Sequence, residues 1–275
     1  MKFHWMHRFD FGNRERELVY MAETLEKSKA YSVLLTYSFG SPDYVPFLPS
    51  MIKATKQIKF MLALRSYTIS PEYAIRIFQT MQNNYGGRLT FNLVAGKMVD
   101  HEEKEAIEMY NFDKSLIDTV DKRIDLADKW ADKFFNFYTQ KNLRPPISYT
   151  IGNSPITLEL GNKWTDYVII HEGRLEESFN GAKNTKLVLT IDPLIRETKE
   201  ELDQDIEYYK QSWKTNLGEK PVVLEKQKHS IRGNMEEVKK QITDISKKYG
   251  IEDFMIVTSQ KDISSLLRLM EEMSS

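Results

Sequence analysis

The stretch IKFMLALRSYTISPEYAIRIFQTMQNNYGGRLTFNLVAGK, residues 58–97, decides the fold, because it alternates between strand and helix patterns. KFMLAL (59–64) is apolar almost throughout, as a strand buried on both faces should be. Ser70-Pro71 supplies an N-cap and a first helical residue, and apolar residues recur after it at helical spacing. Gly86-Gly87 ends that helix, and LTFNLV (89–94) is the next strand. Two buried strands joined by a helix predict parallel pairing.

The rest of the chain repeats this alternation. Further strands are predicted at 3–6, 31–35, 147–152, 166–172, within 185–195 and at 253–259. Helical stripes are predicted at 18–25, 116–138, 202–213, 238–249 and 263–270, and Ser154-Pro155 repeats the serine-proline helix start. Strands and helices in this order favour a single-domain (β/α)8 TIM barrel over residues 1–275. A doubly wound open sheet is the alternative, and the comparable spacing of the units argues against it.

Composition excludes several classes of protein. The chain has 275 residues, a net charge of −1 and no cysteine, so disulfides, thiolate metal sites and cysteine nucleophiles are absent. Acids and bases are balanced without a long basic block, which does not favour nucleic-acid binding. No apolar run reaches the length of a membrane span, and the N-terminus has no secretory h-region. We therefore expect a cytoplasmic protein that binds a small molecule, not a membrane.

The common catalytic signatures are also missing. HExxH, the phosphate loop, G-x-G-x-x-G after a strand and G-x-S-x-G do not occur. The histidines stand at 4, 7, 101, 171 and 229. No two of them have metal-ligand spacing on one helix, so no metal site is predicted.

In a TIM barrel the chemistry lies at the C-terminal ends of the strands. This rule selects His7, Thr36, Tyr37, Arg65, Ala95, Gly96, Gly152, Asn153, His171, Glu172, Asp192, Thr258 and Ser259. From this set we take His7, Arg65, His171 and Asp192 as catalytic candidates. Arg65 would hold an anionic group, and His171 would act as acid or base near neutral pH. Each also has a plain reading as a polar rim residue, and Asp192 before Pro193 as a turn.

Two stretches suggest ligand contacts. In YTIGNSPITLE (149–159) a strand ends at Gly152, and Asn153-Ser154 lead into a helix whose N-terminus would attract phosphate. An ordinary N-cap explains the same residues. Asn92 is a polar residue in an apolar strand, and Ala95-Gly96 leave room for a flat ring. A tight turn is the alternative there.

Taken together, these segments resemble the bacterial luciferase-like flavin monooxygenase superfamily, nearest its alkanesulfonate monooxygenase branch. The resemblance rests on residues 58–97, which hold a strand ending Ala-Leu-Arg, a Ser-Pro helix start, a Gly-Gly-Arg turn and a strand ending F-N-L-V-x-G. Residues 145–169, 195–202 and 248–257 are similar to further family segments. The resemblance therefore spans most of the chain.

The resemblance implies a two-component monooxygenase that uses reduced FMN and oxygen on a small organic substrate. The flavin phosphate would bind at Gly152, Asn153 and Ser154. The ring would lie near Leu62, Ala63 and Asn92, with its edge at Ala95. The family often carries a non-proline cis peptide at the end of the third strand, which we expect near Leu62–Leu64. A separate flavin reductase and a homodimer are the implied partners.

The sequence departs from the alkanesulfonate branch at several positions. An Arg-x-His pair of that branch is replaced by Thr190 and Asp192, and its cysteine after the second strand aligns with Ser41. A phosphate-binding arginine of luciferase aligns with Ala95, and the segment that covers the substrate is short, at about 214–233. Two alternatives remain: a non-catalytic flavin-binding or partner subunit, and a deazaflavin-dependent oxidoreductase.

Overall fold

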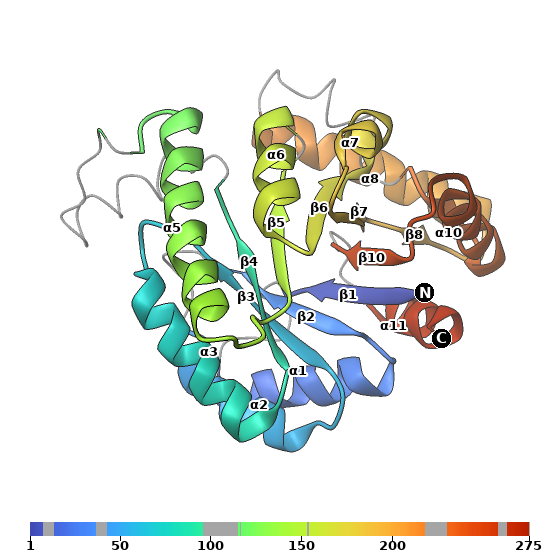
Figure 1. Cartoon of the computed structure of the whole chain (residues 1–275). Helices are drawn as coiled ribbons and strands as arrows, with labels where there is room; N and C mark the ends of the chain where they lie inside the picture. Colours follow the sequence, from blue (N-terminus) through green and yellow to red (C-terminus); the bar gives the residue numbers. More distant parts are fainter. Residues whose placement is uncertain are drawn as a thin grey trace.

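Strands β1 to β7 and β10 close into a parallel barrel in the order β1-β10-β7-β6-β5-β4-β3-β2 (Figure 1). The computed structural model describes residues 1–7, 14–36, 43–95, 115, 117–152, 154–217, 230–257 and 263–274, with backbone alone for 209–217. The barrel strands are β1 Lys2–Met6, β2 Ser32–Leu35, β3 Lys59–Leu64, β4 Leu89–Leu93, β5 Ser148–Ile151, β6 Tyr167–His171, β7 Lys186–Ile191 and β10 Asp253–Ile256. The predicted TIM barrel is confirmed.

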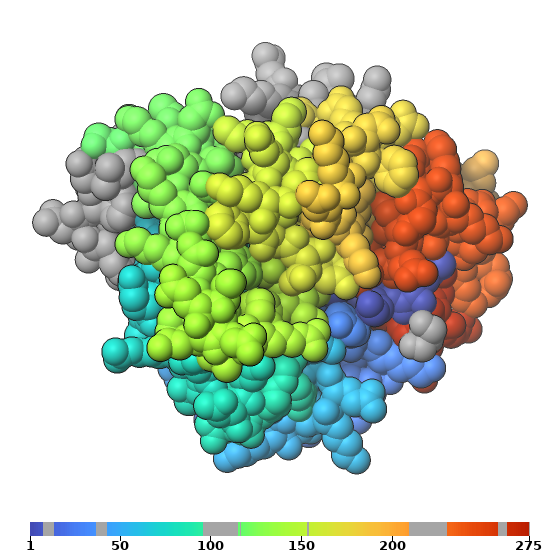
Figure 2. Space-filling view, in the orientation of Figure 1, coloured from blue at the N-terminus to red at the C-terminus, as the bar shows by residue number. Residues whose placement is uncertain are grey.

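Helices surround the barrel on its outer face (Figure 1). They are α1 Glu15–Lys27, α2 Leu48–Ala54, α3 Pro71–Tyr85, α5 Val120–Gln140, α6 Pro155–Trp164, α7 Leu175–Gly181, α8 Lys199–Leu217, α10 Met235–Tyr249 and α11 Ser264–Met273, with short 3₁₀ turns η2 Val45–Phe47 and η4 Glu172–Arg174. The N- and C-terminal segments meet at one side of the molecule, where β1 pairs with β10 (Figure 2).

The β3-α3-β4 unit forms as its sequence predicts. Ser70 caps α3, since its Oγ accepts a hydrogen bond from the N–H of Tyr73 at 3.2 Å. Gly86 ends the helix with φ +66, a positive value that residues with a Cβ rarely adopt. Arg88 then turns back under the barrel and donates to the carbonyl oxygens of Ile52, Thr55 and Ile58. The Gly-Gly-Arg sequence therefore ends α3 and ties the start of β4 to the segment between α2 and β3.

Side chains on the strands sort into two clusters. Residues such as Phe60, Phe91 and Leu189 join the helices in an outer cluster. The inner cluster consists of Leu34, Met61, Tyr149, Ile169, Val188 and Met255, all from barrel strands. Successive strand residues alternate between these clusters, because side chains along a strand point to opposite faces. This alternation decides which side chains at the strand ends can face the barrel interior.

Several local features differ from the sequence predictions. The stripe predicted from 116 begins as a helix at Val120, with Thr119 as its N-cap, and Leu116 lies outside the described residues. The segment 185–195 divides at Asp192-Pro193 into β7 and a separate strand, β8 Leu194–Ile195. That strand pairs with β9 Arg232–Gly233 in a two-stranded sheet. The short helices α2 and α7 were not predicted.

The backbone at the end of β3 corrects one expectation of the resemblance. All peptide bonds in the described ranges are trans, so the cis peptide expected near Leu62–Leu64 is not present. The same part of the chain contains no helix that is long and apolar enough to traverse a bilayer.

Candidate active site

The C-terminal mouth of the barrel is the candidate site. Within β1 to β10 the strand residues are mostly buried, but the inward-facing positions at this end become partly exposed: Met6, Thr36, Ala63, Val94, Ile151 and Val257. Met6, Ala63, Ile151 and Val257 pack directly on the inner cluster. The inward-facing side chains at this end, which we call the mouth, are therefore reachable from solvent and are mostly apolar. Such a lining suits a flat aromatic ring or an apolar substrate.

Asn92 and Thr190 are buried polar side chains that face the barrel interior near the mouth. Asn92 lies between Phe91 and Leu93, which both belong to the outer cluster, so its side chain faces inward. It is 1% exposed, and its Oδ1 has no hydrogen-bond partner among the described residues. Thr190 lies on β7 in the same way, and its buried Oγ1 likewise lacks a partner in the described ranges. Buried oxygens without partners are costly, so both are positions where a bound ligand could donate a hydrogen bond.

Closer to the rim than Asn92 and Thr190, charged side chains follow the ends of β3 and β7 on opposite sides of the mouth. Arg65, two residues beyond Ala63, is 6% exposed, and its guanidinium lies 5.9 Å from the ring centroid of Tyr67. Asp192 is half-buried, two residues beyond Thr190. The mouth thus has a basic wall at the end of β3 and an acidic wall at the end of β7, as strand-end position predicts.

The acidic wall continues to the end of β6. His171 pairs in register with Thr190 and is exposed. Glu172 follows it, and its Oε1 accepts a hydrogen bond from the hydroxyl of Ser230. Partial burial and the nearby carboxylate of Asp192 raise the pKa of Glu172 to about 7. Glu172 can therefore carry a proton near neutral pH, a property that the sequence did not reveal.

The turn after β5 has the geometry of an anion site and that of a helix cap. Gly152 has φ +150, and a Cβ there would lie 2.7 Å from Cγ2 of Thr157. Ser154 Oγ lies 2.8 Å from Thr157 Oγ1 and also accepts from the N–H of Thr157 at 3.3 Å. Both hydroxyls thus lie at the positive end of the α6 dipole. Asn153 lies outside the described residues.

Three predicted site residues face the helices instead of the mouth. Leu62 and Ala95 belong to the outer cluster, so Ala63 and Val94 occupy the inward positions near the proposed ring site. The expectation that Ala95 leaves bare space for the ring is therefore wrong, and Gly96 is outside the described residues. His7 packs edge-on against Tyr44 of the outer cluster, with ring centroids 5.8 Å apart. The alternation of strand side chains between the two faces could have shown that all three point away from the mouth.

His7 also has an unusual environment. It is 2% exposed, and its Nδ1 has no hydrogen-bond partner in the part of the chain that the structure describes. Burial lowers the pKa of His7 to about 4. His7 is therefore neutral at pH 7, and its packing against Tyr44 favours a structural role over the catalytic one predicted for it.

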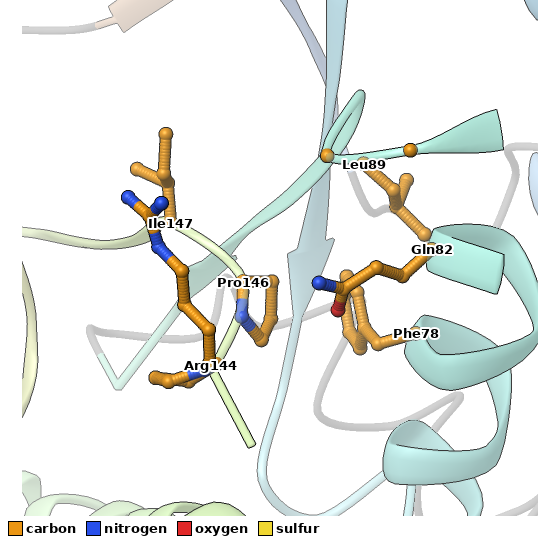
Figure 3. Close-up of a pocket in the computed structure, with 9 residues that line it drawn as sticks. Phe78, Gln82, Leu89, Arg144, Pro146 and Ile147 are labelled. Carbon is orange, nitrogen blue, oxygen red and sulfur yellow. The ribbon is translucent and has the colours of Figure 1, made fainter.

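A metal site and a cleft at the other end of the barrel are the alternatives to the mouth. The described residues contain no group of three or more His, Asp or Glu side chains that could hold a metal ion. A cleft of about 240 Å³ lies at the N-terminal ends of β4 and β5, where Phe78 and Gln82 of α3 face Pro146 and Arg144 (Figure 3). It is at the opposite end of the barrel from the predicted chemistry.

Comparisons with known proteins agree on the fold. No family model matches the sequence. Long-chain alkane monooxygenase (LadA) is 14% identical with a TM-score of 0.78, over 99% of this chain and 90% of that chain. The oxygenating constituent of 3,6-diketocamphane monooxygenase from the CAM plasmid of Pseudomonas putida, solved with FMN, is 12% identical with a TM-score of 0.71, over 100% and 97%. The coenzyme F420 dependent tetrahydromethanopterin reductase from Methanopyrus kandleri is 12% identical with a TM-score of 0.69, over 98% and 97%.

Proposed function

We propose that this chain is an FMN-dependent monooxygenase of the luciferase-like superfamily, which uses reduced FMN and oxygen on a small organic substrate. The observation that carries the proposal is the apolar mouth with the buried, unpartnered Oδ1 of Asn92. The fold shared with flavin and F420 enzymes, and the sequence resemblance of residues 58–97, support it. Fold likeness alone does not assign an activity, so the proposal depends on the site.

The residues of the mouth fit a flavin. Ser154 and the first turn of α6 would bind the phosphate. The neighbouring Gly152 packs against Thr157, where an added Cβ would clash. Ala63 and Val94 would contact the ring, and the amide of Asn92 would accept from a ring N–H. When bound, reduced FMN supplies the chemistry with oxygen.

The remaining roles belong to the charged rim. Arg65 would hold the electron-rich edge of the ring or an anionic group, since its guanidinium stays charged. His171, Glu172 and Asp192 would provide proton transfer at the opposite wall, where Glu172 has a pKa of about 7. The apolar wall would exclude water from the reacting atoms. We further propose that a separate reductase delivers the reduced flavin and that the chain forms a homodimer, as the sequence resemblance implies.

Titration with FMN, oxidised and then anaerobically reduced, tests the proposal. Ser154→Ala should weaken binding of reduced FMN by about tenfold, because a hydrogen bond to a charged phosphate contributes roughly 1.5 kcal/mol. Ser70→Ala is the matched control, since Ser70 caps α3 before Pro71 as Ser154 caps α6 before Pro155. Both variants lose a cap, but only Ser154→Ala should affect FMN.

Three other results have clear meanings. Binding of F420 without binding of FMN would support the deazaflavin alternative. Binding of neither cofactor contradicts the proposal. Equal effects of Ser70→Ala and Ser154→Ala on FMN affinity would remove the phosphate site from the turn after β5.

A further inference from the structure

Thr190 is an unexplained polar residue in the wall of the mouth. Its neighbours Leu189 and Ile191 belong to the outer cluster, and Val188 two residues earlier belongs to the inner cluster. The side chain of Thr190 therefore faces the barrel interior. It is 7% exposed, and its Oγ1 has no hydrogen-bond partner among the described residues.

The surroundings of this hydroxyl are apolar on the β10 side. Thr190 pairs in register with Met255, which is fully buried in the inner cluster. Val257, whose N–H donates to the carbonyl of Ile191 at 2.9 Å, continues the wall toward the rim. A charged ligand group placed on this side of Thr190 would lose its hydration against apolar side chains, which makes its burial costly.

The negative charge of Asp192 further restricts which ligands can bind near Thr190. Asp192 follows the end of β7, two residues beyond Thr190, and is partly exposed. Its negative charge acts on the end of β6, where it contributes to the raised pKa of Glu172. A sulfonate or carboxylate that enters along β7 would therefore be repelled. Arg65 lies on the opposite wall, at the end of β3, on the side proposed for the flavin ring.

We propose that Thr190 determines substrate specificity, and that the substrate is a mainly apolar molecule with one uncharged hydrogen-bonding group, such as an alcohol or a carbonyl. The reaction of this substrate rests on the proposed function, but its binding at Thr190 does not. A ligand oxygen or hydroxyl at Thr190 would satisfy the orphaned Oγ1. An alkane of the same length would leave it unpaired and bind less tightly.

Calorimetric titration of the whole chain, with and without saturating FMN, tests this inference. The probes are octan-1-ol, octane-1-sulfonate and octylammonium. Octan-1-ol should bind best, and Thr190→Val should weaken its binding by about tenfold, the usual effect of one lost hydrogen bond. Thr190→Ser should retain most of the affinity, since it keeps the hydroxyl.

The folding of the variant provides a second readout. Valine has the shape of threonine without the hydroxyl, so Thr190→Val should leave the urea unfolding midpoint unchanged or raise it. A hydroxyl that held the barrel together would lower that midpoint when removed. A lowered midpoint together with unchanged octan-1-ol affinity would overturn the inference.

The remaining outcomes are also decisive. Tighter binding of octane-1-sulfonate or octylammonium than of octan-1-ol, or no octan-1-ol binding with or without FMN, overturns the inference. If FMN does not bind but octan-1-ol binding depends on Thr190, the flavin proposal fails and this inference stands. If FMN binds and Thr190→Val has no effect on octan-1-ol, this inference alone fails.

Discussion

The imidazole of His4 in the first barrel strand lies 3.1 Å from the carboxylate of Asp253 in the last one, Nε2 to Oδ1. Its Nδ1 lies 2.7 Å from the hydroxyl of Ser32 on β2. His4 is fully buried, and burial lowers its pKa although Asp253 acts in the opposite direction. A neutral His4 can donate to Asp253 and accept from Ser32. The three side chains thus join β10, β1 and β2 where the barrel closes.

Removing the carboxylate of this network should destabilise the barrel strongly. Asp253→Ala leaves a buried imidazole N–H without its acceptor, and we expect the free energy of unfolding to fall by about 3 kcal/mol. Urea denaturation at pH 7 measures it. Asp125→Ala is the control, because Asp125 forms an exposed i,i+4 pair with Lys129 and should change stability by less than about 0.5 kcal/mol. Equal losses in both variants would contradict a structural role of the His4–Asp253 pair.

Acid should destabilise the protein through His7. Its pKa is about 4 in the folded chain and 6.5 as the ordinary value, so the unfolded chain binds the proton more readily. Stability is therefore lost as pH falls from 6.5 toward 4, and between pH 7 and pH 5 this site should contribute a loss of about 2 kcal/mol. Urea unfolding of wild type and His7→Asn at both pH values measures the difference, since other titrating groups are common to both. Parallel pH profiles would refute the assignment.

Arg88 should matter more to stability than its partial exposure suggests. Besides the backbone carbonyls under β3, it donates to Oγ1 of Thr55. Arg88→Met should reduce the free energy of unfolding by about 2–3 kcal/mol, because buried carbonyls lose their donors. Arg76→Met on the exposed face of α3 is the matched control and should be nearly neutral. A small effect at Arg88 would mean that water replaces the guanidinium without cost.

Gly152 and Gly87 offer a matched pair of glycine substitutions. Gly152→Ala places a methyl group against Thr157 at a φ that L-residues rarely adopt, and should cost about 2 kcal/mol. An added Cβ at Gly87 meets no atom within 4 Å, so Gly87→Ala should be close to neutral. Thermal unfolding of both variants provides the comparison. If Gly152→Ala unfolds at the wild-type temperature, the turn after β5 adapts and is not held by Thr157.

The boundaries of the elements were predictable where local chemistry sets them. Ser70, Gly86 and Ser154 act as the caps that their residue types suggest. The sheet of β8 and β9 was not predictable in this way, because Leu194 pairs with Arg232 far along the chain. Helix α2 was missed because it is short and contains Pro49. In such segments packing overrides weak local preference.

The position of the candidate site was predictable, but its composition was not. The strand-end rule selected Arg65, His171 and Asp192, which the structure finds around the mouth. It also selected His7, whose side chain packs on the helix side. In the sequence, Thr190 was notable only because it replaces part of the Arg-x-His pair of the alkanesulfonate branch. The burial of its hydroxyl without a partner among the described residues depends on which face of β7 points into the barrel, and the neighbouring strands decide that.

The sequence by itself determined the barrel. Apolar strands that alternate with amphipathic helices bury their side chains and pair their backbones when the strands run parallel and the helices cover them. It also determined the helix caps, since these depend on residues only a few positions apart. The tertiary structure decided which strand-end side chains meet in the mouth and which face the helices. It alone brought His4 to Asp253. Such contacts depend on strand register and barrel closure, which no local segment of the chain specifies.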